Sequence, residues 1–304
     1  MKQLQKLSII IPFHNEAENL PELLKAIEYE FESLLQNLKH EIILVDDGSL
    51  DDYKPGIQAY VSFPHITLVK MGRQMGKGKA LNAGIRASTG DLIVFMDADL
   101  QDDPADLHAF LGKIHEGYDL VNGVRYDRQD TALVKVYSKI ARWFLKRYLH
   151  SPFTDINCGF KMFRKVLLDD IAIYGNNFRF FPLAAFYEGY RVTEVHVHNR
   201  PRLYGKSKYG AKKLFIGLID MGSAYFLYQF SDRPLHFFGS IGSVFASVGF
   251  VALAFITYQR IFEGILLYRR PALQYATFFI ILGIQIIMTG ILGELMVYLH
   301  KKKS

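Results

Sequence analysis

The sequence predicts a doubly wound, mainly parallel α/β sheet followed by amphipathic helices and a two-helix transmembrane hairpin. The sheet is predicted by apolar runs of strand length that alternate with amphipathic segments of helix length. It is also predicted by acidic residues that directly follow the runs at 41–46 and 91–96. The hairpin is predicted because no Asp, Glu, Lys or Arg occurs at 234–258 or 271–293. Either stretch can cross a bilayer core of about 30 Å.

The elements of the α/β part follow from hydrophobic periodicity. Strands are predicted at 7–12, 41–46, 66–70, 91–96 and 118–124, and helices at 16–38, 80–87, 104–115 and 131–149. Strands joined by helices favour parallel pairing with right-handed crossovers. The expected division is an α/β domain at 1–205, a juxtamembrane interfacial helix at 206–232 and a hairpin at 233–304, with spans near 235–258 and 272–297.

Composition narrows the classes of protein. The 304 residues include 36 Lys and Arg against 30 Asp and Glu, so the net charge of +6 is a mild excess, and no nucleic-acid partner is expected. Cys158 is the single cysteine, which excludes an internal disulfide and favours a reducing compartment. Because it has no evident base beside it, Cys158 is expected to be a packed small residue.

Flanking charges predict the topology of the hairpin. Lys206, Lys208, Lys212, Lys213 and Arg233 precede the first span, and Lys301, Lys302 and Lys303 follow the second. Basic residues favour the cytoplasmic side, so the α/β domain and both termini are expected there. Glycines and serines in both spans suit close helix packing in lipid, and Glu294 is expected to face protein or the interface.

The acidic segment that follows the run at 91–96 is the first candidate site. Asp97 and Asp99 are two residues apart, so in extended backbone they would point the same way and, with the amide oxygen of Gln101, could bind one divalent cation. Such a cation would hold a diphosphate. The alternative is an acidic loop before a helix, with Pro104 in the first turn and Asp102 or Asp103 as the cap.

A glycine-rich basic loop is the second candidate. Gly76-Lys77-Gly78-Lys79 precedes a helix and suits a diphosphate, but it lacks the spacing of a Walker loop or a dinucleotide fingerprint. A glycine turn with solvated lysines explains it equally well. His196 and His198 alternate on a predicted strand and resemble a metal pair, although ordinary structural histidines are favoured because no third ligand is in view.

Two further segments could lie near a membrane surface. The helix predicted at 131–149 carries a basic stripe of Lys135, Lys139, Arg142 and Lys146. A solvated face and a face against anionic headgroups both explain this stripe. Residues 209–230 are the second interfacial candidate, and Trp143 is expected to be a buried or interfacial anchor.

Six blocks taken together resemble glycosyltransferase family two. They are Ile10-Ile-Pro-Phe-His-Asn-Glu16, Val45-Asp-Asp-Gly-Ser49, Gly76-Lys-Gly-Lys-Ala80, Asp97-Ala-Asp-Leu-Gln101, Asp155-Ile-Asn-Cys-Gly-Phe-Lys161 and Gly205-Lys-Ser-Lys-Tyr209. More narrowly, they resemble its membrane-anchored polyprenyl-phosphate glycosyltransferases, of the dolichol-phosphate mannose synthase type and of the bacterial type that loads glucose onto undecaprenyl phosphate. The likeness covers nearly the whole chain.

This resemblance implies a GT-A fold, a UDP- or GDP-linked sugar donor, Mg²⁺ or Mn²⁺, and transfer with inversion. By position, the implied metal ligands are Asp97, Asp99 and Gln101. The implied donor-binding residues are Pro12, Asn15, Glu16, Asp47, Lys77, Lys79 and Asp97. The implied acceptor-phosphate residues are Arg125, Lys135 and Ser138, and the implied catalytic residues are Asp99, Asp155, Arg125 and Arg202.

The expected reaction is transfer of a hexose to undecaprenyl or dolichyl phosphate at the cytoplasmic membrane face. Asp155 could orient the acceptor, act as a base, or only cap a turn. Three other functions stay open: a processive polysaccharide synthase, a transferase with a different acceptor, and a non-catalytic scaffold that binds sugar nucleotides. The sequence leaves the nucleotide, the sugar and a homo-oligomeric state open.

Overall fold

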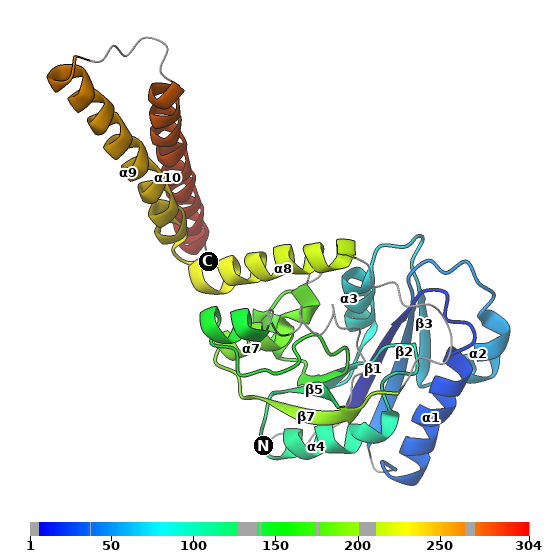
Figure 1. Ribbon diagram of the computed structural model, residues 1–304. Helices are drawn as coiled ribbons and strands as arrows, with labels where there is room; N and C mark the ends of the chain where they lie inside the picture. Colours follow the sequence, from blue (N-terminus) through cyan, green and yellow to red (C-terminus); the bar gives the residue numbers. More distant parts are fainter. Residues whose placement is uncertain are drawn as a thin grey trace. The chain divides into compact units, whose positions relative to one another are not determined.

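The structure is a computed structural model that describes residues 6–36, 38–126, 139, 142–173, 175, 177–200, 211–264 and 271–303. The chain divides into two compact units, Met1–Met221 and Gly222–Ser304, and each is described by itself. The first unit contains the sheet and the second contains the two long apolar helices (Figure 1).

A seven-stranded sheet forms the centre of the first unit, in the order β3-β2-β1-β4-β6-β5-β7. The strands are β1 (Lys6–Phe13), β2 (Lys39–Asp46), β3 (Ile66–Lys70), β4 (Leu92–Phe95), β5 (Leu120–Tyr126), β6 (Lys161–Arg164) and β7 (Val192–His198). Strand β6 is antiparallel to both β4 and β5, and the other pairs are parallel. The prediction of a mainly parallel sheet is confirmed. The sequence did not predict β6, because its apolar run is only Met162-Phe163.

Helices cover both faces of the sheet. They are α1 (Leu20–Ser33), α2 (Lys54–Val61), α3 (Lys77–Ala87), η1 (Pro104–Asp106), α4 (Leu107–His115), α6 (Leu167–Asp170), η2 (Asn177–Arg179) and α7 (Phe181–Tyr187). A further helix, α8 (Ala211–Phe230), crosses the boundary between the two units. Residues 142–148 are also helical, and they lie within the helix predicted at 131–149. Helix α1 begins four residues later than predicted, because residues 16–19 form a turn. Helix α3 begins three residues earlier, so Lys77 lies in its first turn.

The core has two layers, one on each side of the sheet. Ile9 and Ile11 of β1 belong to a cluster that includes apolar residues of α1, α2 and α4. On the other face a Cβ on Gly84 of α3 would touch Ile10, and Phe95 of β4 packs against Phe181 of α7. Because both faces are covered, β1 and β4 are buried on both sides, as parallel strands usually are.

The order in which successive strands are added to the sheet reverses at β1. Strands β2 and β3 lie on one side of β1, and β4 lies on the other side. In open α/β sheets, ligands bind outside the carboxyl ends of the strands at such a switch point. The segments that follow β1 at His14 and β4 at Met96 therefore mark the place where a site is expected.

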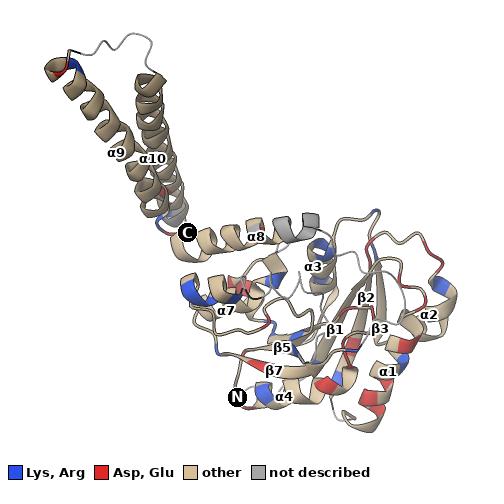
Figure 2. Cartoon of the chain, viewed as in Figure 1, with Lys and Arg blue, Asp and Glu red and all other residues tan. Residues whose placement is uncertain are grey.

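The second unit contains α9 (Pro234–Phe262) and α10 (Pro271–Lys303), which pack against each other (Figure 1). Among the described residues these are the two helices long and apolar enough to cross a membrane. Most of their large apolar side chains are exposed, unlike those of a core helix. Charged residues lie towards the helix ends (Figure 2). Glu294 accepts a hydrogen bond from the backbone N–H of Leu235 at 3.2 Å, so it faces protein as expected.

Small residues let α9 and α10 approach closely. A Cβ on Gly242 would lie 2.6 Å from the carbonyl oxygen of Gly283, and a Cβ on Gly249 would lie 2.7 Å from that of Ala276. Gly239 differs, because its Cβ would meet only the side chain of Leu235, at 3.6 Å. The expectation that glycines pack the hairpin is confirmed for Gly242 and Gly249, whereas Gly239 meets only a side chain of its own helix.

Gly242→Ala is expected to destabilise the hairpin by about 1–3 kcal/mol, because the added methyl group overpacks a contact with backbone atoms. Gly239→Ala is the matched control in the same helix. It should leave stability unchanged or raise it slightly, since alanine favours a helix. Unfolding of the full chain in mixed detergent micelles, followed by circular dichroism, measures both. Equal midpoints for the two variants would contradict the packing.

Candidate functional site

The loops after β1 and β2 are hydrogen-bonded to each other at the switch point. The Nδ1 atom of His14 lies 3.0 Å from the carbonyl oxygen of Asp47. The side chain of Asn15 accepts a hydrogen bond from the backbone N–H of Leu50 at 2.8 Å, and the backbone N–H of Asn15 donates to Ser49 Oγ at 3.0 Å. Asn15 itself is exposed, with a left-handed φ of 58°. The two loops therefore form one rim beside the carboxyl end of β1.

Two other residues predicted to bind the donor, Pro12 and Glu16, belong to the same rim. Pro12 is half-buried in β1 and pairs with Val45 of β2. The carboxylate of Glu16 accepts a hydrogen bond from the side chain of Asn19 at 2.5 Å, which keeps it next to the start of α1. The structure thus brings the predicted residues of the first two sequence blocks together.

Asp47 holds the glycine-rich loop in place. Its carboxylate accepts hydrogen bonds from the N–H of Met75 at 2.7 Å and of Gly76 at 2.9 Å. Gly76 has a φ of 93°, which a residue with a Cβ rarely adopts. Lys77 follows at once in the first turn of α3, and Lys79 is exposed. Asp47 therefore positions the loop that carries the predicted phosphate-binding lysines.

The acidic segment after β4 is a turn and not extended backbone. Residues 96–100 lie outside β4, and Leu100 has a left-handed φ of 60°. The prediction that Asp97 and Asp99 point the same way through strand alternation is therefore wrong, and the turn places them instead. The turn is tied together by its own side chains: Asp99 Oδ1 accepts from the N–H of Gln101, and Asp102 Oδ2 accepts from that of Asp97, both at 3.3 Å.

The charges of this turn are only partly balanced. Lys77 forms an ion pair with Asp97. Partial burial would raise the pKa of Asp97, but the Lys77 ammonium holds it below its usual value. Burial, followed by the negative charge of Asp97, raises the pKa of Asp102 to about 7. Carboxylate and amide oxygens are the ligands that Mg²⁺ and Mn²⁺ prefer, so the side chains of Asp97, Asp99 and Gln101 suit a divalent cation by their chemistry.

Asp102 and Asp103 were the two candidates for the cap of the following helix. Asp103 is the cap, because its side chain accepts from the N–H of Ala105 at 3.2 Å, with Pro104 in the first turn. Asp102 is instead buried, and its carboxylate accepts the hydrogen bond from the N–H of Asp97. The sequence missed this third carboxylate, and the only available signal was its place in an acidic run directly after a buried strand.

The block at 155–161 lies against the acidic turn. A Cβ on Gly159 would lie 2.6 Å from Asp97 Oδ2, so a side chain at this position would displace the carboxylate. Cys158 is 1% exposed, and burial raises the pKa of its thiol to about 12. The expectation that Cys158 is a packed residue is confirmed. Gly159 is a site-shaping residue that the sequence did not identify.

Arg125 and Asp155 form a bidentate ion pair at the end of β5. The guanidinium donates from Nε to Asp155 Oδ2 at 2.7 Å and from Nη2 to Oδ1 at 3.0 Å. Both side chains are 16% exposed. Glu194 of β7 anchors the loop beneath them by accepting from the N–H of Thr154 at 2.9 Å. The two residues, predicted separately as catalytic, therefore act as one unit.

Lys161 supplies a buried cation that the sequence did not assign to the site. It is 1% exposed, and its ammonium donates to Asn122 Oδ1 at 2.7 Å and to the carbonyl oxygens of Ile156 at 3.1 Å and Cys158 at 2.5 Å. Burial lowers the pKa of Lys161 to about 8. Its three acceptors fix the loop that holds Gly159 and Asp155, so Lys161 positions the site.

Lys161→Met is expected to destabilise the protein by about 2–5 kcal/mol, because it leaves three buried acceptors without a donor. The native pKa of about 8 lies below the ordinary 10.5, so the unfolded chain binds more protons between these values. The Lys161 contribution to the free energy of unfolding should therefore rise as the pH increases from about 8 towards 10.5. The test compares the denaturant midpoints of wild type and Lys161→Met across this pH range, with a chelator present to remove metal ions. The exposed Lys25→Met is the control. A pH-independent difference between wild type and Lys161→Met would contradict it.

The end of β7 is fastened to the helix that follows the acidic turn. His198 Nδ1 lies 2.7 Å from Asp106 Oδ1, and Arg200 forms an ion pair with Asp103. The hydrogen bond to Asp106 raises the pKa of His198. His196 and His198 belong to no cluster of three metal-binding side chains among the described residues. The structural interpretation of His198 is thereby supported.

Several predicted residues lie outside the described part of the chain. They are Lys135, Ser138 and Arg202, together with the block Gly205-Lys-Ser-Lys-Tyr209. Of the basic stripe, Lys139, Arg142 and Lys146 are described, and all three are exposed. Trp143 is 59% exposed, which excludes a buried anchor.

This chain resembles an enzyme of known structure and matches the model of a protein family. Crystal structures of glucosyl-3-phosphoglycerate synthase from Mycobacterium tuberculosis share the fold. Its complex with phosphoglyceric acid has a TM-score of 0.57 and 19% identity over 74% of this chain and 80% of that chain. Its complex with Mn²⁺ and uridine-diphosphate-glucose has a TM-score of 0.57 and 18% identity over 73% and 79%. The predicted GT-A type of fold is confirmed.

A family model described as glycosyl transferase family 2 matches residues 8–172, more than half of the sequence, and the chain belongs to that family.

Proposed function

We propose that this protein transfers a hexose, with inversion, from a nucleoside-diphosphate sugar to a polyprenyl phosphate at the cytoplasmic face of a membrane. The observation that carries the proposal is that a glycosyl transferase family 2 region is followed, in the same chain, by two helices long and apolar enough to cross a membrane. Such helices would hold the enzyme at the membrane, where a lipid acceptor lies. The product is a sugar linked to the lipid through one phosphate.

The donor would bind at the ends of β1, β2 and β4. Asp97, Asp99 and Gln101 would hold Mg²⁺ or Mn²⁺, which when bound offsets negative charge on the leaving diphosphate. The solved relative binds Mn²⁺ and uridine-diphosphate-glucose, which supports this assignment. Lys77 and Lys79 lie at the start of α3, where ammonium groups and helix N–H groups favour phosphate. The rim of Pro12, Asn15 and Glu16 would contact the nucleoside.

The acceptor needs charge neutralisation more than it needs a base. A phosphomonoester has a second pKa of about 6, so it is largely dianionic at neutral pH. One of its oxygens attacks the anomeric carbon while the bond from that carbon to the diphosphate breaks, and no proton has to be removed. Arg125, with Lys135 and Ser138, would hold this phosphate in line, and Arg202 would close over the donor phosphates.

Asp155 would orient the acceptor site and not act as a base. Its carboxylate accepts two hydrogen bonds from Arg125, at 2.7 and 3.0 Å, and this weakens it as a proton acceptor. The same bonds fix the guanidinium plane. An arginine whose plane is fixed in this way loses little further entropy when it binds a phosphate.

The proposed arrangement in the membrane follows the charges. Residues 1–205 and both termini would be cytoplasmic, residues 206–232 would lie in the interface, and the hairpin at 233–304 would anchor the chain. The spans expected at 235–258 and 272–297 fall within α9 and α10. The part of the chain that the structure describes holds two such helices, too few to form the channel of a processive polysaccharide synthase.

One assay tests the proposal. The full chain in lipid nanodiscs is incubated with Mg²⁺ or Mn²⁺, UDP- or GDP-linked hexoses, and undecaprenyl phosphate, dolichyl phosphate, phosphoglyceric acid or free glucose. Mass spectrometry should find hexose added to a polyprenyl phosphate, and NMR should show an inverted anomeric centre. Transfer only to a water-soluble acceptor would overturn the lipid acceptor. Donor binding without transfer or hydrolysis would favour the scaffold.

A further inference from the structure

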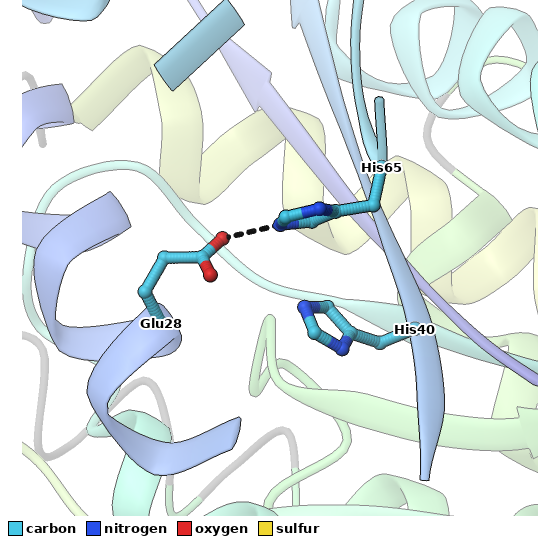
Figure 3. Close-up of side chains that lie close together, drawn as sticks. All are labelled: Glu28, His40 and His65. Carbon is cyan, nitrogen blue, oxygen red and sulfur yellow. Dashed lines mark hydrogen bonds and ion pairs between the residues drawn. The ribbon is translucent and has the colours of Figure 1, made fainter. Parts of the chain in front are cut away.

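A second group of coordinating side chains lies at the amino ends of β2 and β3, the opposite edge of the sheet from the acidic turn. Glu28 comes from α1, His40 from the start of β2, and His65 from the residue before β3. The imidazole of His65 lies 2.8 Å, at Nε2, from Glu28 Oε1. One ligand atom from each of the three residues lies within 4.8 Å of the others. Figure 3 shows the three side chains facing one another.

His40 has a nitrogen that the protein leaves unsatisfied. Its Nε2 atom is fully buried and has no hydrogen-bond partner. The ring is fixed by stacking on Phe31, with centroids 3.7 Å apart and planes at 17°, and by an edge contact with His65 at 4.8 Å. A buried polar atom without a partner costs about 1–3 kcal/mol. A bound ion at this position would give the nitrogen a partner.

The side chains of the cluster suit metal binding. Each of His40 and His65 offers one imidazole nitrogen as a ligand atom, and the buried Nε2 of His40 has no partner within the protein. Glu28 contributes a negative charge. Two imidazoles and one carboxylate form a donor set that Zn²⁺ binds in proteins, with a fourth position left to water.

We propose that Glu28, His40 and His65 bind a divalent transition-metal ion, with Zn²⁺ as the ion that fits their chemistry. Zn²⁺ in tetrahedral sites lies about 2.0–2.1 Å from each nitrogen or oxygen ligand, so neighbouring ligand atoms are about 3.4 Å apart. His65 Nε2 and Glu28 Oε1 lie 2.8 Å apart in their hydrogen bond, so they would have to separate by about 0.6 Å, and the ligand atom of His40, which lies within 4.8 Å of the others, would have to approach by at most about 1.4 Å. The side chains of His65 and Glu28 are 30% and 16% exposed, which gives the ion a path from solvent.

This site differs in chemistry from the acidic turn. Imidazole ligands favour Zn²⁺ over Mg²⁺, whereas the oxygen ligands of Asp97, Asp99 and Gln101 favour Mg²⁺ or Mn²⁺. A Zn²⁺ ion at Glu28, His40 and His65 would join α1 to the ends of β2 and β3. Because ligands that bind only the folded state stabilise it, Zn²⁺ should raise the thermal unfolding midpoint of the protein.

The test measures Zn²⁺ binding by the purified full chain in detergent with Mg²⁺ in excess, using a chromophoric chelator as competitor. Wild type should bind one Zn²⁺ per chain at this site, and its unfolding midpoint should rise by about 2–5 °C. His40→Gln and His65→Gln should each weaken binding at least about tenfold and abolish the rise. Co²⁺ in place of Zn²⁺ should give the visible absorption of a tetrahedral complex in wild type but not in His40→Gln or His65→Gln.

Two controls keep the outcome clear. His115→Gln removes an exposed histidine of α4, and Asp97→Asn changes the acidic turn, and neither should alter Zn²⁺ affinity. His65 precedes β3 and is partly exposed, so His65→Gln should fold even if His40→Gln does not. Absence of Zn²⁺ binding, binding that both histidine variants retain, or binding that Asp97→Asn removes would each overturn the proposal.

Discussion

Asp99→Ala is expected to lower the rate of sugar transfer by about 10²–10³-fold or more, while the protein stays folded. The carboxylate of Asp99 is buried in the acidic turn beside Asp97 and Asp102, where like charges repel. Its removal takes away a proposed metal ligand and relieves this repulsion. Initial rates at saturating donor and acceptor measure the loss, and the thermal midpoint without metal should change little.

The control for this experiment is Glu116→Gln, which neutralises an exposed carboxylate at the end of α4. It should keep wild-type turnover. Raising the Mn²⁺ concentration should partly rescue Asp99→Ala if the loss is one of metal affinity. A turnover of Asp99→Ala within a few fold of wild type would remove Asp99 from the proposed ligand set.

Arg125→Ala is expected to lower kcat/KM for polyprenyl phosphate by about 10²-fold or more, and to change the KM for the donor much less. The guanidinium is proposed to hold the acceptor phosphate, and it is fixed by two hydrogen bonds to Asp155. Breaking the pair also leaves a largely buried carboxylate without its partner, so a loss of stability accompanies the loss of activity. Initial-rate kinetics with each substrate varied in turn separate the two effects.

Arg164→Ala is the matched control, since Arg164 of β6 is also paired with an aspartate, Asp119, at 3.5 Å, but lies outside the proposed site. It should leave both KM values unchanged. Asp155→Asn should resemble Arg125→Ala in its acceptor dependence, and the double variant should be no worse than either single one. A larger effect of Arg125→Ala on the donor than on the lipid would contradict the assignment.

The fold was largely predictable because its signals are local. Strands at the centre of the sheet have uninterrupted apolar runs, and Ile66–Lys70 was predicted with the bounds it has as β3. Strand β6 was missed because two of its four residues are charged, and its Lys161 is buried against acceptors from other segments. The local sequence does not distinguish a lysine that faces solvent from a lysine that is buried.

The candidate site was predicted in its residues but not in its pairings. Lys77 and Asp97 were assigned to the donor from separate blocks, and only the structure shows that they form an ion pair. Asp47 was expected to contact the donor, yet its carboxylate holds the backbone of Met75 and Gly76. Such pairings depend on loops from different strands meeting at one edge of the sheet, which no local pattern encodes.

The amino-acid sequence by itself determined most of the strands, the membrane-length apolar segments and the place of the acidic residues after a buried strand. These features depend on periodicity and composition within some twenty neighbouring residues. Only the tertiary structure decided that Arg125 pairs with Asp155, that Asp102 is buried and accepts from the N–H of Asp97, and that two histidines and a glutamate from three elements meet. Charge pairing and burial depend on distances between residues far apart in the chain, and the folded sheet alone sets those distances.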